Sequence, residues 1–250
     1  MPITNQVRGG GAQYITGDPY FDSVTLLLNC DQDPPTDYSP LAHTPSVVDS
    51  GSGMALNTSF EKFGTGCLSK GSNESYINVP NHAGFQMGDS AFTMEVWMRP
   101  GSLGINDDPD IISLGGGFPA SNRGYWLSIF NHTSIVFNFS LNGTSWAGDL
   151  LFDTSMGSYY AANTWAQYTV SRDADGVLYY FANGVLRDTY DLGSSVINAS
   201  TSDLKFGFND SGAGTPNAQA FDEIRFTKGV CRYTENFNVQ DAAWPLGKFV

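Results

Sequence analysis

The feature that most constrains the fold is a strand-like segment near the C-terminal end, residues 221–227, which reads Phe-Asp-Glu-Ile-Arg-Phe-Thr. Its residues alternate with the period of a β-strand, yet both alternating sets contain apolar and charged members. The charged side chains therefore need partners, a ligand or a position near a sheet end. An apolar strand so late in the chain also needs a neighbour, and residues 24–28 (Val-Thr-Leu-Leu-Leu) are the best candidate. Pairing of these segments ties both ends of the chain into one domain.

The composition of the 250-residue chain favours one all-β domain, with 28 Gly, 12 Pro, 14% aromatic residues and only short apolar runs. Residues 165–190 predict a three-stranded meander, because Asp175-Gly176 and Asn183-Gly184 mark turns about ten residues apart. Further strands are predicted at 24–29, 47–48, 76–79, 92–100, 111–114, 125–130, 135–141, 204–208 and 221–227. We predict an antiparallel two-sheet β-sandwich of about a dozen strands without a long helix.

The formal net charge of −13 (12 Lys and Arg against 25 Asp and Glu) argues against nucleic acid and anionic membranes as partners, because both repel an acidic surface. The sequence contains no transmembrane segment and no hydrophobic signal-peptide core, so secretion by the usual route is not expected. Cys30, Cys67 and Cys231 are far apart and lack metal-binding spacing. We interpret them as buried thiols; one disulfide plus one thiol is the alternative.

The two ends of the chain carry groups outside the predicted strands. Residues 1–20 are rich in Gly and polar residues and are interpreted as a flexible or partner-ordered arm, followed by a single domain at 21–250. The tail at 241–250 contains Trp244 and Phe249 and is expected to lie as a strap across its own sandwich. In an assembly, the alternative is that these ends dock onto neighbouring subunits.

Four segments, in this order, resemble a known family. They are 92–100 (Phe-Thr-Met-Glu-Val-Trp-Met-Arg-Pro), 165–172 with Asp175-Gly176 after it, 179–184 (Tyr-Tyr-Phe-Ala-Asn-Gly) and 221–225 (Phe-Asp-Glu-Ile-Arg). Over residues 22–245 the chain is similar to the laminin-G-like, concanavalin A-like jelly rolls. The tail at 229–237 resembles the version found in bacteriophage structural proteins, with Cys231 in place of a small residue. The resemblance implies a multi-copy virion protein that contacts other virion proteins through its arm.

Catalysis is not expected from these residues. The glucanases of this fold carry a Glu-x-Asp-x-Glu run on one strand, which directs both carboxylates to the sugar. This chain has no such run: Glu95 stands alone, and the adjacent Asp222 and Glu223 are predicted to point to opposite faces. The three histidines, at positions 43, 82 and 132, show neither metal nor triad spacing. A degenerate glycoside hydrolase is therefore the least favoured function.

The resemblance also implies a Ca²⁺ ion at the sandwich edge. Asp31 and Asp33 follow the first strand and Asp222 begins the last one, so antiparallel pairing brings their ends together. Such a cluster offers carboxylate oxygens to a cation that takes about six to eight of them. The alternative is that Asp222 accepts backbone hydrogen bonds and Asp31 forms an Asx turn. The sequence leaves both interpretations open.

Aromatic residues in loop-like stretches are candidates for glycan binding, because a ring stacks on a pyranose while Asp or Asn bonds its hydroxyls. The five candidate residues are Trp146, Tyr159, Tyr160, Asp108 and Asn209, and Tyr125 and Trp126 are further aromatics in a loop-like stretch. A weak site of this kind gains strength when many copies are displayed together. The alternative is that these residues cover loop edges and that Trp97, Trp126 and Trp165 belong to the core.

Taken together, the residues and the resemblance predict a non-enzymatic structural or decoration module of a phage head, tail or fibre, with weak glycan binding. The alternative is a Ca²⁺-dependent carbohydrate-binding lectin or adhesion domain outside a virus. Neither the host nor the glycan is specified by the sequence.

Overall fold

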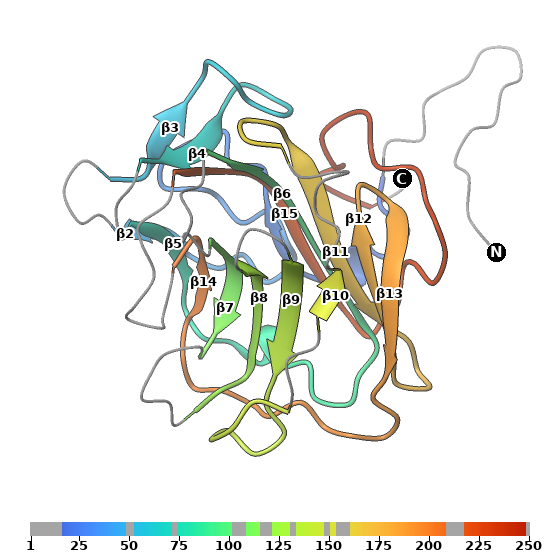
Figure 1. Ribbon diagram of the computed structural model, residues 1–250. Coiled ribbons are helices and arrows are strands. Elements are labelled where there is room, and N and C mark those ends of the chain that lie inside the picture. Colours follow the sequence, from blue (N-terminus) through green and yellow to red (C-terminus); the bar gives the residue numbers. More distant parts are fainter. Residues whose placement is uncertain are drawn as a thin grey trace, which may run out of the picture.

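The computed structural model describes residues 17–48, 53–71, 75–101, 109–115, 122–130, 134–147, 151–153, 161–208 and 218–248. Two antiparallel sheets stack into a β-sandwich, which confirms the predicted fold class (Figure 1). Helical structure in these ranges is limited to two short 3-10 segments, η1 (Phe21–Ser23) and η2 (Ala83–Phe85). Across the same ranges, no helix is long and apolar enough to cross a membrane.

Sheet A contains eight strands and sheet B seven. The strands of sheet A are β1 (Val24–Leu28), β3 (Ala55–Asn57), β4 (Cys67–Lys70), β6 (Phe92–Pro100), β11 (Ala166–Arg172), β12 (Val177–Ala182), β13 (Val185–Asp191) and β15 (Gln219–Lys228). Those of sheet B are β2 (Ser46–Val48), β5 (Tyr76–Val79), β7 (Asp110–Leu114), β8 (Tyr125–Phe130), β9 (Ser134–Phe139), β10 (Leu151–Asp153) and β14 (Leu204–Phe206). Sheet A runs in the order β13-β12-β11-β6-β15-β4-β3, with β1 also on β15, and sheet B in the order β10-β9-β8-β7-β14-β5-β2.

The two ends of the domain pair as predicted. β1 lies antiparallel to β15, with Leu28 opposite Ile224 and Leu27 opposite Arg225. β11, β12 and β13 form the predicted meander. Three short strands, β3, β4 and β10, were not predicted, because none of them carries a run of alternating apolar residues long enough to stand out.

A β-bulge in β15 explains the mixed pattern of residues 221–227. The register against β6 shifts between Asp222 and Ile224, and Glu223 has a φ of +46°. Phe221 before the bulge and Ile224 after it both point into the core. The extra residue therefore resets the alternation and leaves Asp222 and Glu223 on the same, outer face of sheet A. The prediction that these two carboxylates point to opposite faces is wrong for this reason.

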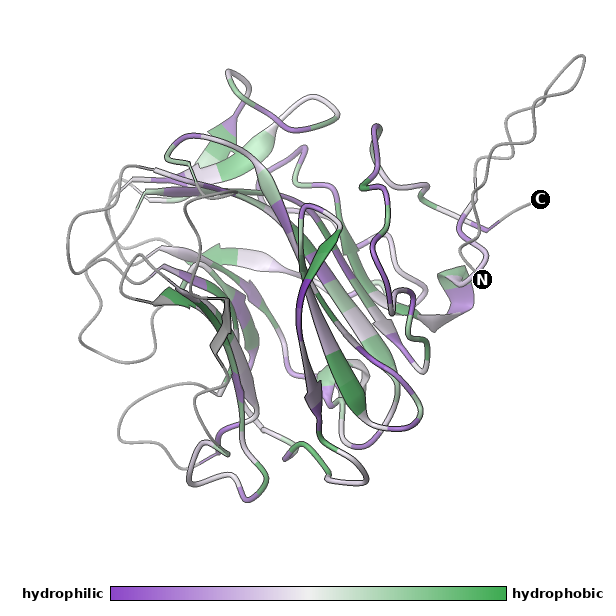
Figure 2. Cartoon of the chain, turned by 45° about the vertical axis from the view of Figure 1, so that its right-hand side comes forward, coloured by the Kyte–Doolittle hydropathy of each residue, from purple (hydrophilic) through white to green (hydrophobic). Residues whose placement is uncertain are grey.

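The apolar core lies between the two sheets. Sheet A contributes Met94 and Val96 from β6, and sheet B contributes Leu127 and Phe137 from β8 and β9, all fully or almost fully buried. Figure 2 shows the two layers, with the N- and C-terminal segments on the far side of sheet A from sheet B. The outer face of sheet A is therefore covered by the chain's own ends.

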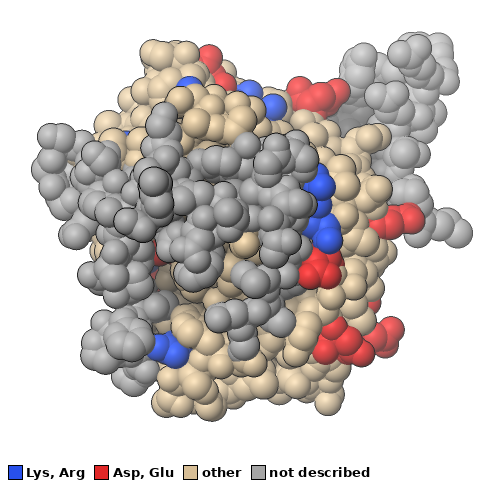
Figure 3. Space-filling view, in the orientation of Figure 1, with Lys and Arg blue, Asp and Glu red and all other residues tan. Residues whose placement is uncertain are grey.

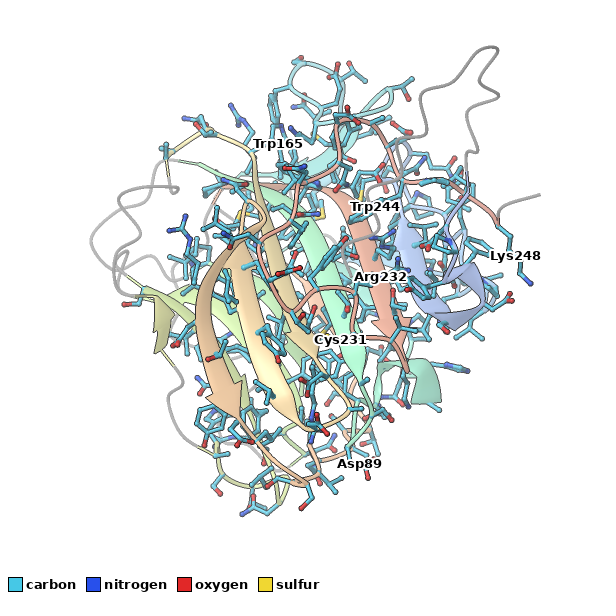
Figure 4. The ribbon with its side chains drawn as sticks, turned by 90° about the vertical axis from the view of Figure 1, so that its right-hand side faces the viewer. Asp89, Trp165, Cys231, Arg232, Trp244 and Lys248 are labelled. Carbon is cyan, nitrogen blue, oxygen red and sulfur yellow. The ribbon has the colours of Figure 1, made fainter. Side chains whose placement is uncertain are left out.

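The tail forms a strap on this outer face. Trp244 is buried against Val24 and Leu27 of β1, and the backbone N–H of Asp18 donates to the carbonyl of Gly247 at 3.0 Å (Figure 4). Residues 17–20 of the predicted arm are thus packed on the domain, and residues 1–16 lie outside the described ranges. All three cysteines are free thiols; Cys30 and Cys67 are buried, and Cys231 is only partly so.

A buried ionic network lies beneath the strap. It supplies partners for charged strand residues whose partners could not be identified from the sequence. Arg225 of β15 donates to Glu95 of β6 at 2.7 Å and to Asp18 at 3.1 Å. Arg232 of the tail donates to both oxygens of Asp18, and Tyr233 donates to Glu95 at 3.1 Å. The network joins both terminal segments to the two central strands of sheet A.

Candidate functional site: an aromatic cluster at the end of sheet B

Of the five predicted glycan-binding residues, only Trp146 lies within the described ranges. Tyr159, Tyr160, Asp108 and Asn209 fall outside them. The site is therefore built from the surroundings of Trp146, which follows β9 in a loop near one end of sheet B (Figure 1).

The loop before Trp146 is closed by its own polar side chains. The Asn142 carboxamide oxygen accepts the backbone N–H groups of Thr144 and Ser145, both at 2.9 Å. The Ser140 hydroxyl donates to the carbonyl of Ser145, and the N–H of Ala147 donates back to Phe139. Short polar residues favour this kind of local turn over a continued strand. The turn fixes the position from which the Trp146 side chain leaves the loop.

Glycine is required at position 143 of this loop. Gly143 has a φ of +76°, and a Cβ atom added there would lie 2.8 Å from the side-chain nitrogen of Asn198. Its carbonyl accepts the N–H groups of Asn122 and Arg123, which precede β8, and Asn198 donates to the Arg123 carbonyl at 2.9 Å. Three segments distant in sequence are thus held together by backbone contacts.

Two tryptophans and one arginine meet at this junction. The rings of Trp126 and Trp146 have centroids 6.2 Å apart and an interplanar angle of 32°. The Arg123 guanidinium lies over the Trp146 ring, with its carbon 5.0 Å from the centroid. All three residues are half-buried, and the Nε atom of Arg123 is fully covered. We call these three residues the aromatic cluster.

The outer face of sheet B continues the aromatic cluster with polar side chains. Trp126 of β8 lies opposite Ser113 of β7 on one side and Asn138 of β9 on the other. The indole N–H of Trp126 donates to the Asp110 carboxylate. Asn138 is only 1% exposed, and its side-chain oxygen has no hydrogen-bond partner within the described ranges. An unpaired buried amide oxygen is costly, which makes this atom a ready acceptor for a ligand hydroxyl.

The interpretation of Trp126 as a core residue is wrong. Its neighbours Tyr125 and Leu127 are core residues, so alternation along β8 places Trp126 on the opposite, outer face. The same alternation was readable in the sequence. Trp97 is buried, but on the outer side of sheet A against Phe63, and Trp165 is half-buried, with its indole N–H on the Phe60 carbonyl at 2.8 Å.

Two of the predicted metal ligands, Asp31 and Asp222, lie on the sheet A side of the molecule, where both contact the loop at 61–66. One Asp31 oxygen accepts the N–H groups of Thr65 and Gly66 and the Thr65 hydroxyl, and the other accepts the side chain of Asn29. One Asp222 oxygen accepts the N–H groups of Lys62 and Phe63, at 2.9 and 3.1 Å. Both carboxylates thus bind the same loop.

These side chains do not by themselves form a calcium cage. Asp33 is exposed, and within the described ranges no group of three or more His, Cys, Asp or Glu side chains could hold a metal. One oxygen of Asp222 is nevertheless buried without a partner. Burial, together with the charge of neighbouring Glu223, raises the pKa of Asp222 to about 8. Calcium binding therefore stays a prediction, with a single free carboxylate oxygen in its favour.

The histidines show a contact that sequence spacing did not indicate. His43 and His82 have ring centroids 4.8 Å apart beside Phe85, and the His82 ring accepts the N–H of Gly84 at the start of η2. His132 lies outside the described ranges. The observed roles of the pair are packing and capping.

A comparison with protein families identifies this architecture. The model for the concanavalin A-like lectin/glucanases superfamily, of laminin-G type, matches residues 71–232, which is more than half of the chain. The chain belongs to this superfamily. No curated protein matches the sequence.

Solved structures similar to this concanavalin A-like domain include clostridial toxin domains. The binding domain of Paraclostridial Mosquitocidal Protein 1 has 16% identity and a TM-score of 0.65, covering 88% of this chain and 50% of that one. The botulinum neurotoxin serotype D/C binding domain has 20% identity and a TM-score of 0.64, with 83% and 49% covered. The binding domain of botulinum neurotoxin DC in complex with SialylT has 21% identity and a TM-score of 0.63, with 83% and 48% covered. This chain spans about half the length of these structures, and identity at this level shows the shared fold alone.

The acidic residues considered as acid or nucleophile of a glucanase are engaged in structural hydrogen bonds and ion pairs. Glu95 is fully buried and bound to Arg225 and Tyr233. Asp222 and Glu223 share one face, but Asp222 is covered by the loop at 61–66 and Glu223 accepts the N–H of Trp244 in the strap. Since an acid and a nucleophile must flank a glycosidic bond, these closed-off carboxylates are not placed to act on one.

Proposed function

We propose that this concanavalin A-like domain is a non-catalytic glycan-binding module of a phage particle, displayed in multiple copies. The observation that carries the glycan-binding part is the pair of half-buried tryptophans, Trp126 and Trp146, beside the buried and unpaired amide oxygen of Asn138. The rings offer an apolar surface, and the amide oxygen needs a donor. A saccharide supplies both partners, because its C–H face stacks on rings while its hydroxyls donate hydrogen bonds.

The geometry favours a saccharide over a peptide or a lipid tail. The two ring centroids are only 6.2 Å apart, so a saccharide of one or two rings is long enough to contact both. Asn138 lies directly across from Trp126 in the β8–β9 pairing, so its side chain is on the same face of sheet B as the Trp126 ring. The similar toxin structures are described as binding domains, one of them in complex with SialylT, which supports a binding role.

Loss of one ring tests the glycan-binding part. In saturation-transfer NMR or on a glycan array, Trp146→Ala should reduce binding of the best glycan at least tenfold, because stacking contributes about 1 kcal/mol or more beyond burial. Tyr20→Ala is the matched control: it removes a partly exposed ring on the sheet A side, against Arg232. Equal binding by wild type and a folded Trp146→Ala variant would refute the proposed site.

The virion part of the proposal is supported by the resemblance of residues 229–237 to phage structural proteins. It assigns residues 1–20 as the contact to other virion proteins, and many copies compensate for a weak site. Mass spectrometry of purified particles should find this chain in multiple copies. A chain lacking residues 1–16 should fold with an unchanged thermal melt but fail to join the particle. Its incorporation at wild-type levels would refute the role of the arm.

The second candidate is a Ca²⁺-dependent lectin, favoured by the free buried oxygen of Asp222. Backbone carbonyls and water would have to supply most of the remaining ligands there. EDTA and Asp222→Asn should then each lower the melting temperature, and EDTA should have no further effect on the variant. A melting temperature indifferent to EDTA and to added CaCl₂ would remove this candidate.

A further inference from the structure

The aromatic cluster contains one group that stacking on a neutral sugar leaves unused, the guanidinium of Arg123. Its Nε–H is buried and has no hydrogen-bond partner in the part of the chain that the structure describes. No Asp or Glu side chain among the described residues forms an ion pair with it. Among those residues, the guanidinium lies over the Trp146 ring, 5.0 Å from its centroid. A half-buried guanidinium with no anion beside it leaves some of its N–H donors without an acceptor.

Other arginines show how this chain satisfies a buried guanidinium. Arg225 and Arg232 are paired with carboxylates at 2.7 Å. The terminal nitrogens of Arg172 donate to three backbone carbonyls, one of them that of Gly88 at 2.7 Å, although its Nε has no partner among the described residues. Arg123 has neither arrangement, although 25 acidic residues are available in the sequence. The missing partner is therefore better explained by a ligand than by a shortage of acids.

The position of Arg123 is fixed independently of any ligand. Its N–H donates to Gly143 at 2.9 Å and its carbonyl accepts from Asn198 at 2.9 Å, so the backbone is tied to both neighbouring segments. The Trp146 ring lies against one face of the guanidinium and restricts its movement on that side. Such preorganisation reduces the entropy lost when the group binds an anion.

The charge of the chain makes a local cation necessary for an acidic ligand. The net charge is −13, and the described part of the face seen in Figure 3 carries scattered acidic and basic groups among mostly uncharged atoms. An anionic sugar would be repelled by most of this surface, and it gains attraction only where a guanidinium is held beside a stacking platform. A planar guanidinium also matches carboxylate and sulfate oxygens in a bidentate contact.

We infer that the aromatic cluster takes an acidic saccharide, whose carboxylate or sulfate binds Arg123 while the sugar ring stacks on Trp126 and Trp146. Asn138 accepts a hydroxyl of the same glycan on the Trp126 side. This inference rests on the proposed glycan-binding function and adds the class of sugar to it. No covalent step is involved; the contacts are ionic, hydrogen-bonding and stacking.

A glycan array with matched neutral, carboxylated and sulfated forms of the same backbones tests the inference, followed by titration calorimetry on the best set. We expect at least tenfold tighter binding of an acidic form than of its neutral parent. The ratio should fall as NaCl rises from low to high concentration, because salt screens an accessible ion pair. The carboxylated and sulfated arms distinguish the two sources of the anion.

Three variants separate the effect of the Arg123 charge on binding from effects on folding. Arg123→Gln should bring the acidic-to-neutral affinity ratio close to one, whereas Arg123→Lys should keep part of the preference, because it retains the charge without the planar fork. Lys248→Gln is the charge-matched control, since Lys248 is exposed and lies near the end of the strap on the sheet A side (Figure 4). It should leave the ratio unchanged.

The outcomes distinguish the inference from the function on which it rests. Equal affinity for acidic and neutral glycans, or an Arg123→Gln variant that melts like wild type and keeps the preference, overturns the acidic-saccharide inference alone. Absence of binding to every glycan form overturns the glycan-binding function and the inference together.

Discussion

The buried ionic network under the strap should be one of the most sensitive positions in the molecule. It contains two guanidiniums, Arg225 and Arg232, and two carboxylates, Glu95 and Asp18, so it is neutral as a whole. Glu95→Gln removes one negative charge and leaves a net positive charge at a place where Arg225 is 5% exposed. Breaking a buried pair by removing one partner typically costs about 3–5 kcal/mol. We expect a loss of this size in the free energy of unfolding.

Urea unfolding followed by tryptophan fluorescence measures this loss, with stability extrapolated linearly to zero denaturant. The control is Asp22→Asn, which removes the partner of Lys248 in a pair whose side chains are 70% and 58% exposed. Solvent screens such a pair, so its loss should cost less than about 1 kcal/mol. If Glu95→Gln costs no more than Asp22→Asn, the network does not hold the strap in the way described above.

Three further results are expected from single features. Burial raises the pKa of Asp222 to about 8 and that of Glu223 to about 7, above their unfolded values, so the folded state binds more protons. The contribution of these two groups to the free energy of unfolding should therefore fall as the pH rises from about 4 to about 8, with a slope approaching about 1.4 kcal/mol per pH unit for each proton, and Asp222→Asn should flatten this part of the curve. Gly143→Ala should lower the free energy of unfolding, measured by chemical denaturation, by about 1–3 kcal/mol, because alanine is strained at the positive φ of this position, and it should also weaken glycan binding. Gly71→Ala is the control; it has open space around it and should change the free energy of unfolding very little. Trp244→Ala should lower the unfolding free energy by about 3–5 kcal/mol and expose the strap to proteolysis; unchanged protease resistance would argue against the packing of the tail on β1.

Local patterns in the sequence were enough to predict the fold class and most of the strands. The alternation at 92–100 and the two Gly-containing turns after 172 and 182 depend only on residues close together in sequence. They can therefore be recognised without knowing which strands pair in space. The pairing of 24–28 with 221–227 was also predictable, because two apolar strands at the ends of one domain each need a partner. Trp126 could have been assigned correctly, since the alternation with Tyr125 and Leu127 puts it on the other face.

The tertiary structure alone decided the faces of β15 and the composition of the candidate site. One extra residue, Glu223 at a φ of +46°, reversed the alternation, and nothing in the sequence marks a bulge at a non-glycine residue. The aromatic cluster joins Arg123 and Trp126 to Trp146, from the loop after β9, and the contacts that fix it come from residue 198. Such contacts depend on how distant segments are brought together in space, and a single sequence contains no direct record of that arrangement.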